Sequence, residues 1–367
     1  MRILVNTSCL TRGGGLQVAL SFIEECRAHP EHDYHIVLEQ SIHTSFDTKS
    51  FPENHTFYAI KKPSRHPKSI LQLKALEKTL APDCVFSVFG PAYWTPKAPH
   101  LVGFALPPFY DDSPYKNLLS RLELFKHQSL RRFKYQRFAK EADALVAETD
   151  YIRSLLLKLF PHIPTYTVSN TFHRCFSLAK PVATINQETP PIYKLLYVSA
   201  YYRHKNFEII PEVVDALLHR GVKDFCFYLT LPEAVYAQII PEKYRYHVLT
   251  VGPQHIENCP SLYQQCHCSF IPTLTECFTA TYPESMVMRR PILTSDLSFA
   301  RSLCGEAALY FQPLNPEDIA EKIILLMHNK ELQNSLILKG EAQVKLFHSA
   351  ADRATAYLDI CKNLIIS

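Results

Sequence analysis

Two glutamates flank a polar turn in the second half of this 367-residue chain. Glu276 and Glu284 are eight residues apart, within the stretch from Pro272 to Met286 that follows an apolar run. We expect a helix to begin near Pro283, where the first peptide N–H groups are unpaired and carry partial positive charge. Such a helix start stabilises a bound phosphate. Carboxylates on either side of it could accept hydrogen bonds from the hydroxyl groups of a sugar.

Other readings of both glutamates remain open. Thr281-x-x-Glu284 has the spacing of a capping box, in which the glutamate only satisfies the first amide of a helix. The spacing does not distinguish capping from ligand binding. An isolated loop glutamate such as Glu276 is most often simply solvated.

Two further loops could approach an anionic ligand. Arg203 and Lys205 follow the apolar run 194–199 and precede a predicted helix, Asn206–Arg220, that Gly221 should end. Three of the nine glycines, Gly13, Gly14 and Gly15, fall in one turn before a predicted helix, Leu16–Cys26. Glycine lets a ligand approach the backbone closely, although a tight strand-to-helix turn would also explain these three.

The stretch from Glu276 to Glu284 resembles the E-x7-E signature of the retaining nucleotide-sugar glycosyltransferases of family 4, which have the GT-B fold. Residues 197–206, YVSAYYRHKN, resemble that family's loop ending in lysine and asparagine. Residues 291–296 and 307–313 resemble the strands that follow. The resemblance covers most of the second half of the chain and is looser in the first half.

The resemblance implies a role for each of these residues. Glu284 would hold the ribose hydroxyls of the nucleotide, Glu276 would contact the transferred sugar, and Lys205 would neutralise the leaving diphosphate. The backbone amides that face the sugar or its phosphate would be those of Cys277, Phe278 and Thr279. The loop Gly13–Gly15 would line the cleft near the acceptor.

Two departures from the family pattern affect the catalytic groups. Ala200 stands where the family usually has an arginine, and Arg203 is our candidate for supplying the missing charge. No histidine follows the predicted strand Leu101–Ala105, and His100 lies at its opposite end, so we assign no general base. Residues of the following loop are cleft candidates only: Tyr110, Asp111 and Asp112.

The function that the resemblance implies is hexosyl transfer with retention, from a UDP- or GDP-sugar to an acceptor hydroxyl. Neither a metal nor another cofactor is expected. A saccharide or lipid-linked saccharide of bacterial envelope polysaccharide, lipopolysaccharide or glycolipid assembly would be the acceptor. Two alternatives remain: a nucleotide-sugar epimerase of the same fold, and a catalytically weak nucleotide-sugar-binding partner subunit.

Apolar runs alternate with helical periodicity throughout the chain, which predicts two Rossmann-like α/β domains with parallel sheets. We expect an N-terminal domain at 1–176, a proline-containing linker at 177–191, a second domain at 192–346, and a C-terminal helix at 347–367 that returns to the first domain. Residues 317–330 and 331–346 are predicted as helices. The predicted strands are Ile3–Asn6, Tyr34–Glu39, Thr56–Ile60, Cys84–Phe89, Leu101–Ala105, Ala144–Ala147, Tyr166–Ser169, Lys194–Ser199, Phe225–Leu231, Val248–Val251, Cys268–Pro272, Ile292–Thr294 and Ala308–Phe311.

Composition and charge limit the partners. The formal net charge of +4 is too small to indicate a nucleic-acid-binding protein. Eleven cysteines without a CxxC pair argue against a zinc site, including at Cys266-His267-Cys268, and favour a reducing compartment. With no signal-peptide or membrane-span pattern, we expect a cytoplasmic protein.

Residues 116–140 carry eight lysines or arginines and one glutamate, interleaved with apolar residues. A basic amphipathic helix there could lie on the anionic inner face of a membrane. A helix that packs its apolar stripe on its own domain and leaves its basic face in water fits the pattern equally well.

Overall fold

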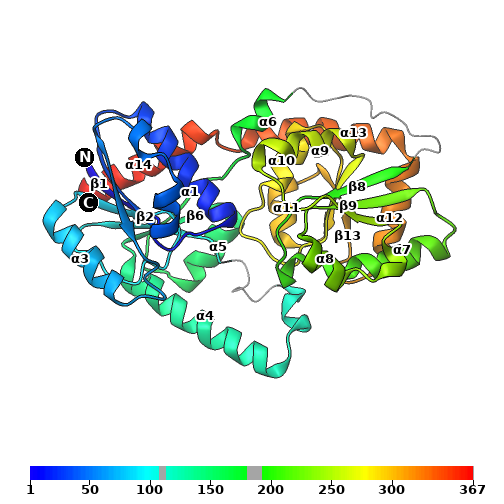
Figure 1. Ribbon diagram of the computed structural model, residues 1–367, viewed down its shortest axis with the longest axis horizontal. Helices are drawn as coiled ribbons and strands as arrows, with labels where there is room; N and C mark the ends of the chain where they lie inside the picture. Colours follow the sequence, from blue (N-terminus) through cyan, green and yellow to red (C-terminus); the bar gives the residue numbers. More distant parts are fainter. Residues whose placement is uncertain (107–112, 180–191, 367) are drawn as a thin grey trace. The chain divides into compact units, whose positions relative to one another are not determined.

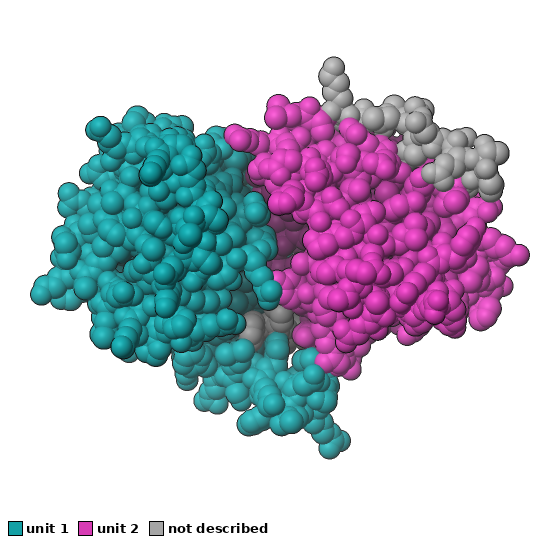
Figure 2. Space-filling view, viewed as in Figure 1, with its two compact units in different colours: residues 1–109, 119–170, 348–367 teal, residues 110–118, 171–347 magenta. Residues whose placement is uncertain are grey.

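The computed structural model describes residues 1–106, 113–179 and 192–366 in two compact units. Unit 1 comprises residues 1–109, 119–170 and 348–367, and unit 2 comprises residues 110–118 and 171–347 (Figure 2). Each unit contains one sheet whose paired strands are all parallel. The predicted fold class, two parallel-sheet α/β domains, is confirmed.

Unit 1 has a seven-stranded sheet in the order β3-β2-β1-β4-β5-β6-β7. Figure 1 labels β1, β2 and β6 of this sheet. Its strands are β1 (Arg2–Asn6), β2 (Asp33–Glu39), β3 (His55–Ile60), β4 (Cys84–Ser87), β5 (His100–Phe104), β6 (Ala144–Ala147) and β7 (Thr165–Thr167). Its helices are α1 (Gly13–Glu25), α2 (Gln40–Ser45), α3 (Lys68–Leu80), α4 (Arg121–Glu141), α5 (Asp150–Leu159) and α14 (Ala350–Ile366).

Both faces of this sheet are covered, because consecutive side chains of a strand point to opposite faces. Ile3 belongs to the core beneath α1 and α14, whereas its neighbour Leu4 belongs to the core beneath α3. In α14, the Tyr357 ring packs against Phe22 of α1 and Phe86 of β4, with centroids 5.6 and 4.9 Å apart. The C-terminal helix is therefore part of the hydrophobic core of unit 1.

Unit 2 has a six-stranded sheet in the order β10-β9-β8-β11-β12-β13. Its strands are β8 (Tyr193–Tyr197), β9 (Phe225–Leu229), β10 (Val248–Thr250), β11 (Cys268–Ile271), β12 (Ile292–Ser295) and β13 (Ala308–Phe311). Its helices are α6 (Arg174–Leu178), α7 (Ile210–His219), α8 (Glu233–Ile239), α9 (Cys259–Gln265), α10 (Thr281–Val287), α11 (Ser298–Cys304), α12 (Pro316–His328) and α13 (Lys330–Gln343). Gly221 follows α7 with φ +79°, which confirms the predicted glycine cap.

The basic stretch 116–140 is not one helix. Residues Pro114–Leu118 form a short 3₁₀ helix, η4, and α4 begins only at Arg121, after a capping box between Ser120 and Glu123. The structure contradicts packing of the whole apolar stripe on the chain's own domain: Phe138 is buried, but four large apolar side chains of α4 are exposed. They are Leu122, Phe125, Leu130 and Phe133, with exposed fractions of 63, 66, 47 and 47%. None of the described helices is long and apolar enough to span a membrane.

The predicted linker 177–191 overlaps the end of α6 at Leu178, and residues 180–191 lie outside the described part of the chain. Residues 110–118 group with unit 2 although the sequence places them within the first half. Their neighbours in sequence on both sides belong to unit 1.

Candidate functional site

The strand order of unit 2 reverses between β8 and β11, which are paired side by side. In open α/β sheets, ligands bind outside the carboxyl ends of the strands at such a reversal. The loop after β8 carries Lys205, and the loop after β11 carries Glu276. The topology alone therefore brings two of the predicted site residues to the same edge of the sheet.

Lys205 and Glu276 form an ion pair. The Lys205 ammonium group donates to Glu276 Oε1, and the Thr273 hydroxyl donates to the same oxygen over 3.1 Å. The two charged side chains are only 15 and 6% exposed. Each buried charge needs such a partner, because removing one ion from water costs several kcal/mol in a real protein.

Backbone contacts hold the two loops together. The Leu274 amide donates to the His204 carbonyl over 2.8 Å, and the Asn206 side-chain amide donates to the Pro272 carbonyl over 3.3 Å. Asn206 has φ +57°, a left-handed conformation that asparagine tolerates better than most residues. In addition, the Tyr197 hydroxyl donates to the Lys205 carbonyl over 2.9 Å. The backbone that carries the ion pair is thus fixed from both strands.

Glu284 lies on α10 and is buried, with 5% of the residue exposed. Its Oε2 accepts a hydrogen bond from the Tyr263 hydroxyl of α9 over 2.8 Å. Burial raises the pKa of Glu284 from 4.5 to about 7, and the Tyr263 hydrogen bond opposes this rise. A buried carboxyl group with a raised pKa is a candidate functional residue.

The capping-box interpretation of Glu284 is wrong. The N-cap of α10 is Ala280, which makes no side-chain cap, and the Thr281 hydroxyl donates to the Val198 carbonyl over 3.3 Å. The Glu284 carboxylate instead accepts the Tyr263 hydrogen bond, and its side chain does not cap the start of the helix.

The predicted backbone donors lie between the two glutamates. Cys277 and Thr279 are buried, and the half-buried Phe278 ring packs edge-on against Phe347 with centroids 5.7 Å apart. The side chains of this segment are therefore packed into unit 2. Contact of this segment with a sugar or phosphate remains a prediction.

Arg203 lies in the 3₁₀ turn Arg203–Lys205, and its guanidinium donates to the Leu118 carbonyl. This contact joins the turn to residues 110–118 of the same unit. Ala200 is exposed nearby in sequence. That Arg203 replaces the missing arginine is still a prediction. Its hydrogen bond to the Leu118 carbonyl is a structural contact that the sequence did not indicate.

The glycine turn Gly13–Gly15 belongs to unit 1, where it forms the start of α1 after β1. Gly13 has φ +74°, which requires glycine there. His100 begins β5 fully buried, with its ring bonded to the Ser87 hydroxyl and the Glu141 carbonyl, each over 2.8 Å. Burial lowers its pKa to about 4, in keeping with a structural histidine. The cleft candidates lie outside the described residues: Tyr110, Asp111 and Asp112.

Two residues of the site were missed by sequence reasoning. Tyr263 was unremarkable because an aromatic residue in a short helix indicates a core position, and its ring does pack on Phe176, with centroids 5.7 Å apart. Thr273 precedes Glu276 by three residues in the same loop, and this short spacing was the one sequence feature that could have indicated their hydrogen bond.

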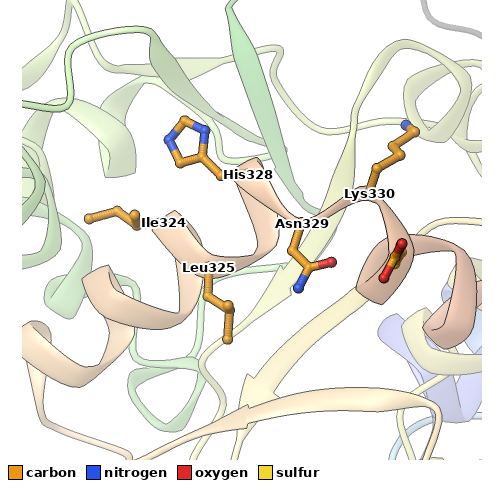
Figure 3. Close-up of a pocket in the computed structure, with 6 residues that line it drawn as sticks. Ile324, Leu325, His328, Asn329 and Lys330 are labelled. Carbon is orange, nitrogen blue, oxygen red and sulfur yellow. The ribbon is translucent and has the colours of Figure 1, made fainter.

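Other features of unit 2 do not contribute to this site. An open hollow of about 480 Å3 lies at the junction of α12 and α13 (Figure 3), lined by Ile324, Leu325, His328, Asn329, Lys330 and Glu331. Cys268 lies buried in β11, as predicted, and the neighbouring His267 ring stacks on Tyr193 with centroids 4.8 Å apart. Across the described residues, no three His, Cys, Asp or Glu side chains are grouped to hold a metal ion.

Comparison with known proteins bears on both units. Residues 192–329 match the family model described as glycosyl transferases group 1. The uncharacterized glycosyltransferase MJ1178 of Methanocaldococcus jannaschii is 24% identical over 157 residues. That match covers 41% of this chain and 43% of the relative, so the chain spans less than half the length of this curated protein.

Solved structures match over the whole length. A sucrose-phosphate synthase from Thermosynechococcus elongatus has a TM-score of 0.77 at 14% identity, covering 100% of this chain and 99% of that one. Anabaena Alr3699/HepE, in complex with UDP and glucose, has a TM-score of 0.71 at 13% identity, covering 99 and 100%. At these identities the likeness shows the fold. Residues 192–329 thus match a glycosyltransferase family model, and the whole chain has the fold of these solved structures.

Proposed function

We propose that the protein transfers a hexosyl group from a UDP- or GDP-sugar to an acceptor hydroxyl, with retention of anomeric configuration and without a metal ion. The observation that carries the proposal is the buried Lys205–Glu276 pair at the reversal point of the sheet in unit 2. Both charges lie where ligands of parallel α/β sheets bind. The complex of Anabaena Alr3699/HepE with UDP and glucose provides a fold-level precedent for such a donor.

The chemistry needs charge stabilisation more than a protein nucleophile. The bond between the anomeric carbon and the phosphate oxygen breaks, a bond from the acceptor oxygen to that carbon forms on the same face, and the departing phosphate takes the acceptor proton. Lys205 would stabilise the charge that develops on the diphosphate, and Glu276 would then be free to accept hydrogen bonds from the sugar hydroxyls. Such fixed groups act strongly because they lie in a site of low dielectric.

Glu284 would accept hydrogen bonds from the ribose hydroxyls. With the capping role excluded, the described hydrogen-bond partner of its side chain is Tyr263. A nucleotide would supply two hydroxyl donors to a carboxyl group whose burial disfavours its charged form. This assignment rests on the position of Glu284 eight residues beyond Glu276 and on its exclusion from the cap.

We further propose that α4 lies on an anionic membrane surface that presents a lipid-linked saccharide acceptor, as in envelope polysaccharide, lipopolysaccharide or glycolipid assembly. Leu122 and Phe125 are more than half exposed, and Lys126 and Arg132 are exposed on the same helix. Apolar side chains that insert among cations suit a bilayer with anionic headgroups. The protein would then work at the inner face of the membrane, without crossing it.

The experiment that tests the proposal is a thermal-shift panel of UDP, GDP and their hexose conjugates on wild type, Glu284→Gln and Lys205→Met. A ligand at a hundredfold excess over its dissociation constant should stabilise the wild type by about 2.7 kcal/mol. We expect Glu284→Gln to weaken every nucleotide of the preferred base by about tenfold, since charge-assisted hydrogen bonds are lost. Lys205→Met should weaken binding of the diphosphates far more than binding of uridine or guanosine, which serve as controls without a phosphate.

Turnover and products distinguish the alternatives. Sugar transfer that continues in the presence of EDTA would support a metal-independent reaction. A product whose glycosidic bond has the anomeric configuration of the donor, as determined by NMR, would support retention. Conversion of the donor sugar without any acceptor would indicate an epimerase, and binding without turnover would indicate a nucleotide-sugar-binding subunit. No stabilisation by any nucleotide would contradict the proposed donor site.

A further inference from the structure

A short segment from the first half of the chain is built into unit 2. Residues 110–118 group with that unit, and their described part, Ser113 together with η4, contacts both loops that carry the ion pair. Ser113 is itself buried, with 7% exposed, and its hydroxyl also accepts the Tyr115 amide over 3.1 Å. This arrangement is a folded turn with a fixed hydroxyl position.

The first contact is to the loop after β11. The Ser113 hydroxyl donates to the Leu274 carbonyl over 2.6 Å. Leu274 is fully buried and lies two residues before Glu276. Because a buried carbonyl is costly to leave without a donor, Ser113 fixes the peptide that leads into Glu276.

The second contact is to the loop after β8. The Tyr115 ring packs edge-on against His204, with centroids 6.0 Å apart, and Tyr202 stacks on the same imidazole at 5.6 Å. Burial lowers the pKa of His204 to about 3, so the ring between the two tyrosines is neutral. Arg203 adds its bond to the Leu118 carbonyl. The segment thus holds the two residues that immediately precede Lys205.

We propose that Ser113–Leu118 is a positioning segment for the donor site, in which Ser113 and Tyr115 hold Glu276 and Lys205 in the geometry that receives the diphosphate and sugar. The inference rests on the proposed function. It assigns no direct ligand contact to Ser113 or Tyr115. Misplacement of a charged group by about 1 Å is enough to reduce catalysis substantially, so such support has functional value.

The test compares four substitutions with a matched control. Ser113→Ala and Tyr115→Ala remove the two contacts, whereas Ser113→Thr and Tyr115→Phe keep a hydroxyl and a ring. Asn117→Ala, at an exposed position of the same segment, is the control. Thermal-shift titrations with UDP-glucose and UMP, and with GDP-mannose and GMP, separate the diphosphate-sugar half of the site from the nucleoside half.

We expect both alanine variants to bind the nucleotide sugar about tenfold more weakly, a free-energy change of about 1.4 kcal/mol. Ser113→Ala loses the hydrogen bond to the Leu274 carbonyl, and Tyr115→Ala loses the ring contact with His204. Binding of the monophosphate should stay within about twofold, since Glu284 and Tyr263 lie on other elements. The threonine and phenylalanine variants should recover nucleotide-sugar binding. Equal weakening of both ligands would overturn the proposal, because it would indicate general loosening of unit 2.

Amide hydrogen exchange on the unliganded protein gives a second, ligand-free readout. Ser113→Ala should speed exchange in residues 203–206 and 273–276, and Asn117→Ala should not. Unchanged exchange in these two loops would also overturn the proposal. If no nucleotide binds the wild type, the proposed function fails while this measurement still decides whether the segment positions the loops.

Discussion

Replacement of Glu284 by glutamine should change how the stability of unit 2 depends on pH. Glu284 is buried, and burial raises its pKa from 4.5 to about 7. Glutamine has nearly the same shape and can still accept the Tyr263 hydrogen bond, but it never ionises. The pair of proteins therefore isolates the free-energy cost of charging one buried carboxyl group.

The sign follows from proton binding in the two states. Between pH 4.5 and about 7, the folded protein keeps the Glu284 proton that the unfolded chain has released, so stability falls as pH rises through this window. Below pH 4.5 both states are protonated and there is no penalty. Well above pH 7 both states are ionised, and a pKa difference of about 2.5, at roughly 1.4 kcal/mol per pKa unit, amounts to about 3.5 kcal/mol.

The assay is urea unfolding of the wild type and Glu284→Gln at pH 5, 6, 7 and 8, followed by a probe in unit 2, since two-domain proteins need not unfold in one step. Relative to wild type, the variant should gain about 2.5 kcal/mol of stability between pH 5 and pH 8, since part of the effect is already present at pH 5. Glu141 of unit 1, whose pKa burial also raises to about 7, is common to both proteins and cancels in the difference. A difference between the two proteins that does not vary with pH would refute the reasoning. Saturating nucleotide should reverse the trend at pH 8, because the ribose hydroxyls would then solvate the charge.

Two further predictions concern unit 1. Phe125→Ser should weaken binding to phosphatidylglycerol vesicles by about tenfold or more in a flotation assay, because burying a phenylalanine side chain contributes about 1.5–3 kcal/mol. The control is Leu346→Ser, which changes a leucine of unit 2 that is 73% exposed and should have no effect. Equal losses in the two variants would argue against a membrane-binding surface on α4. Gly103→Ala should destabilise unit 1 by about 3 kcal/mol or more, since a Cβ there would lie 1.9 Å from the Val88 carbonyl oxygen. Gly14→Ala, where no atom lies within 4 Å of the added Cβ, is the matched control in chemical denaturation, and similar losses for both would contradict the packing at Gly103.

The sheets were the most predictable part of the fold. Strands buried on both faces are nearly continuous apolar runs, and each predicted strand overlaps an observed one. Helix boundaries were less certain: α1 begins at Gly13, not at Leu16, because the glycines form its first turn. The stretch 116–140 was predicted as one helix, although Ser120 and Glu123 carry the signature of a new helix start that composition alone conceals.

The candidate site was predictable where local sequence determines it. Lys205 and Glu276 each follow a strand by a short loop, so the order of the strands brings them together. The role of Glu284 could not be separated from capping, because Thr281-x-x-Glu284 has the correct spacing and the deciding partner, Tyr263, comes from another helix. Sequence periodicity identified the elements but could not identify which side chain of one helix faces which of another.

The contact between Ser113 and Leu274 marks the limit of such reasoning. These residues are 161 positions apart, and the stretch that contains Ser113 reads as part of the first half of the chain. Local sequence propensity does not indicate that the Ser113 hydroxyl, from the first half of the chain, donates a hydrogen bond to the Leu274 carbonyl in the second half. The ion pair between Lys205 and Glu276 depends on backbone geometry at both of its ends, and Ser113–Leu118 contacts both. A site of this kind is therefore specified locally in its chemistry and non-locally in its geometry, so substitutions of Ser113 or Tyr115 should alter function without touching any residue of the E-x7-E stretch.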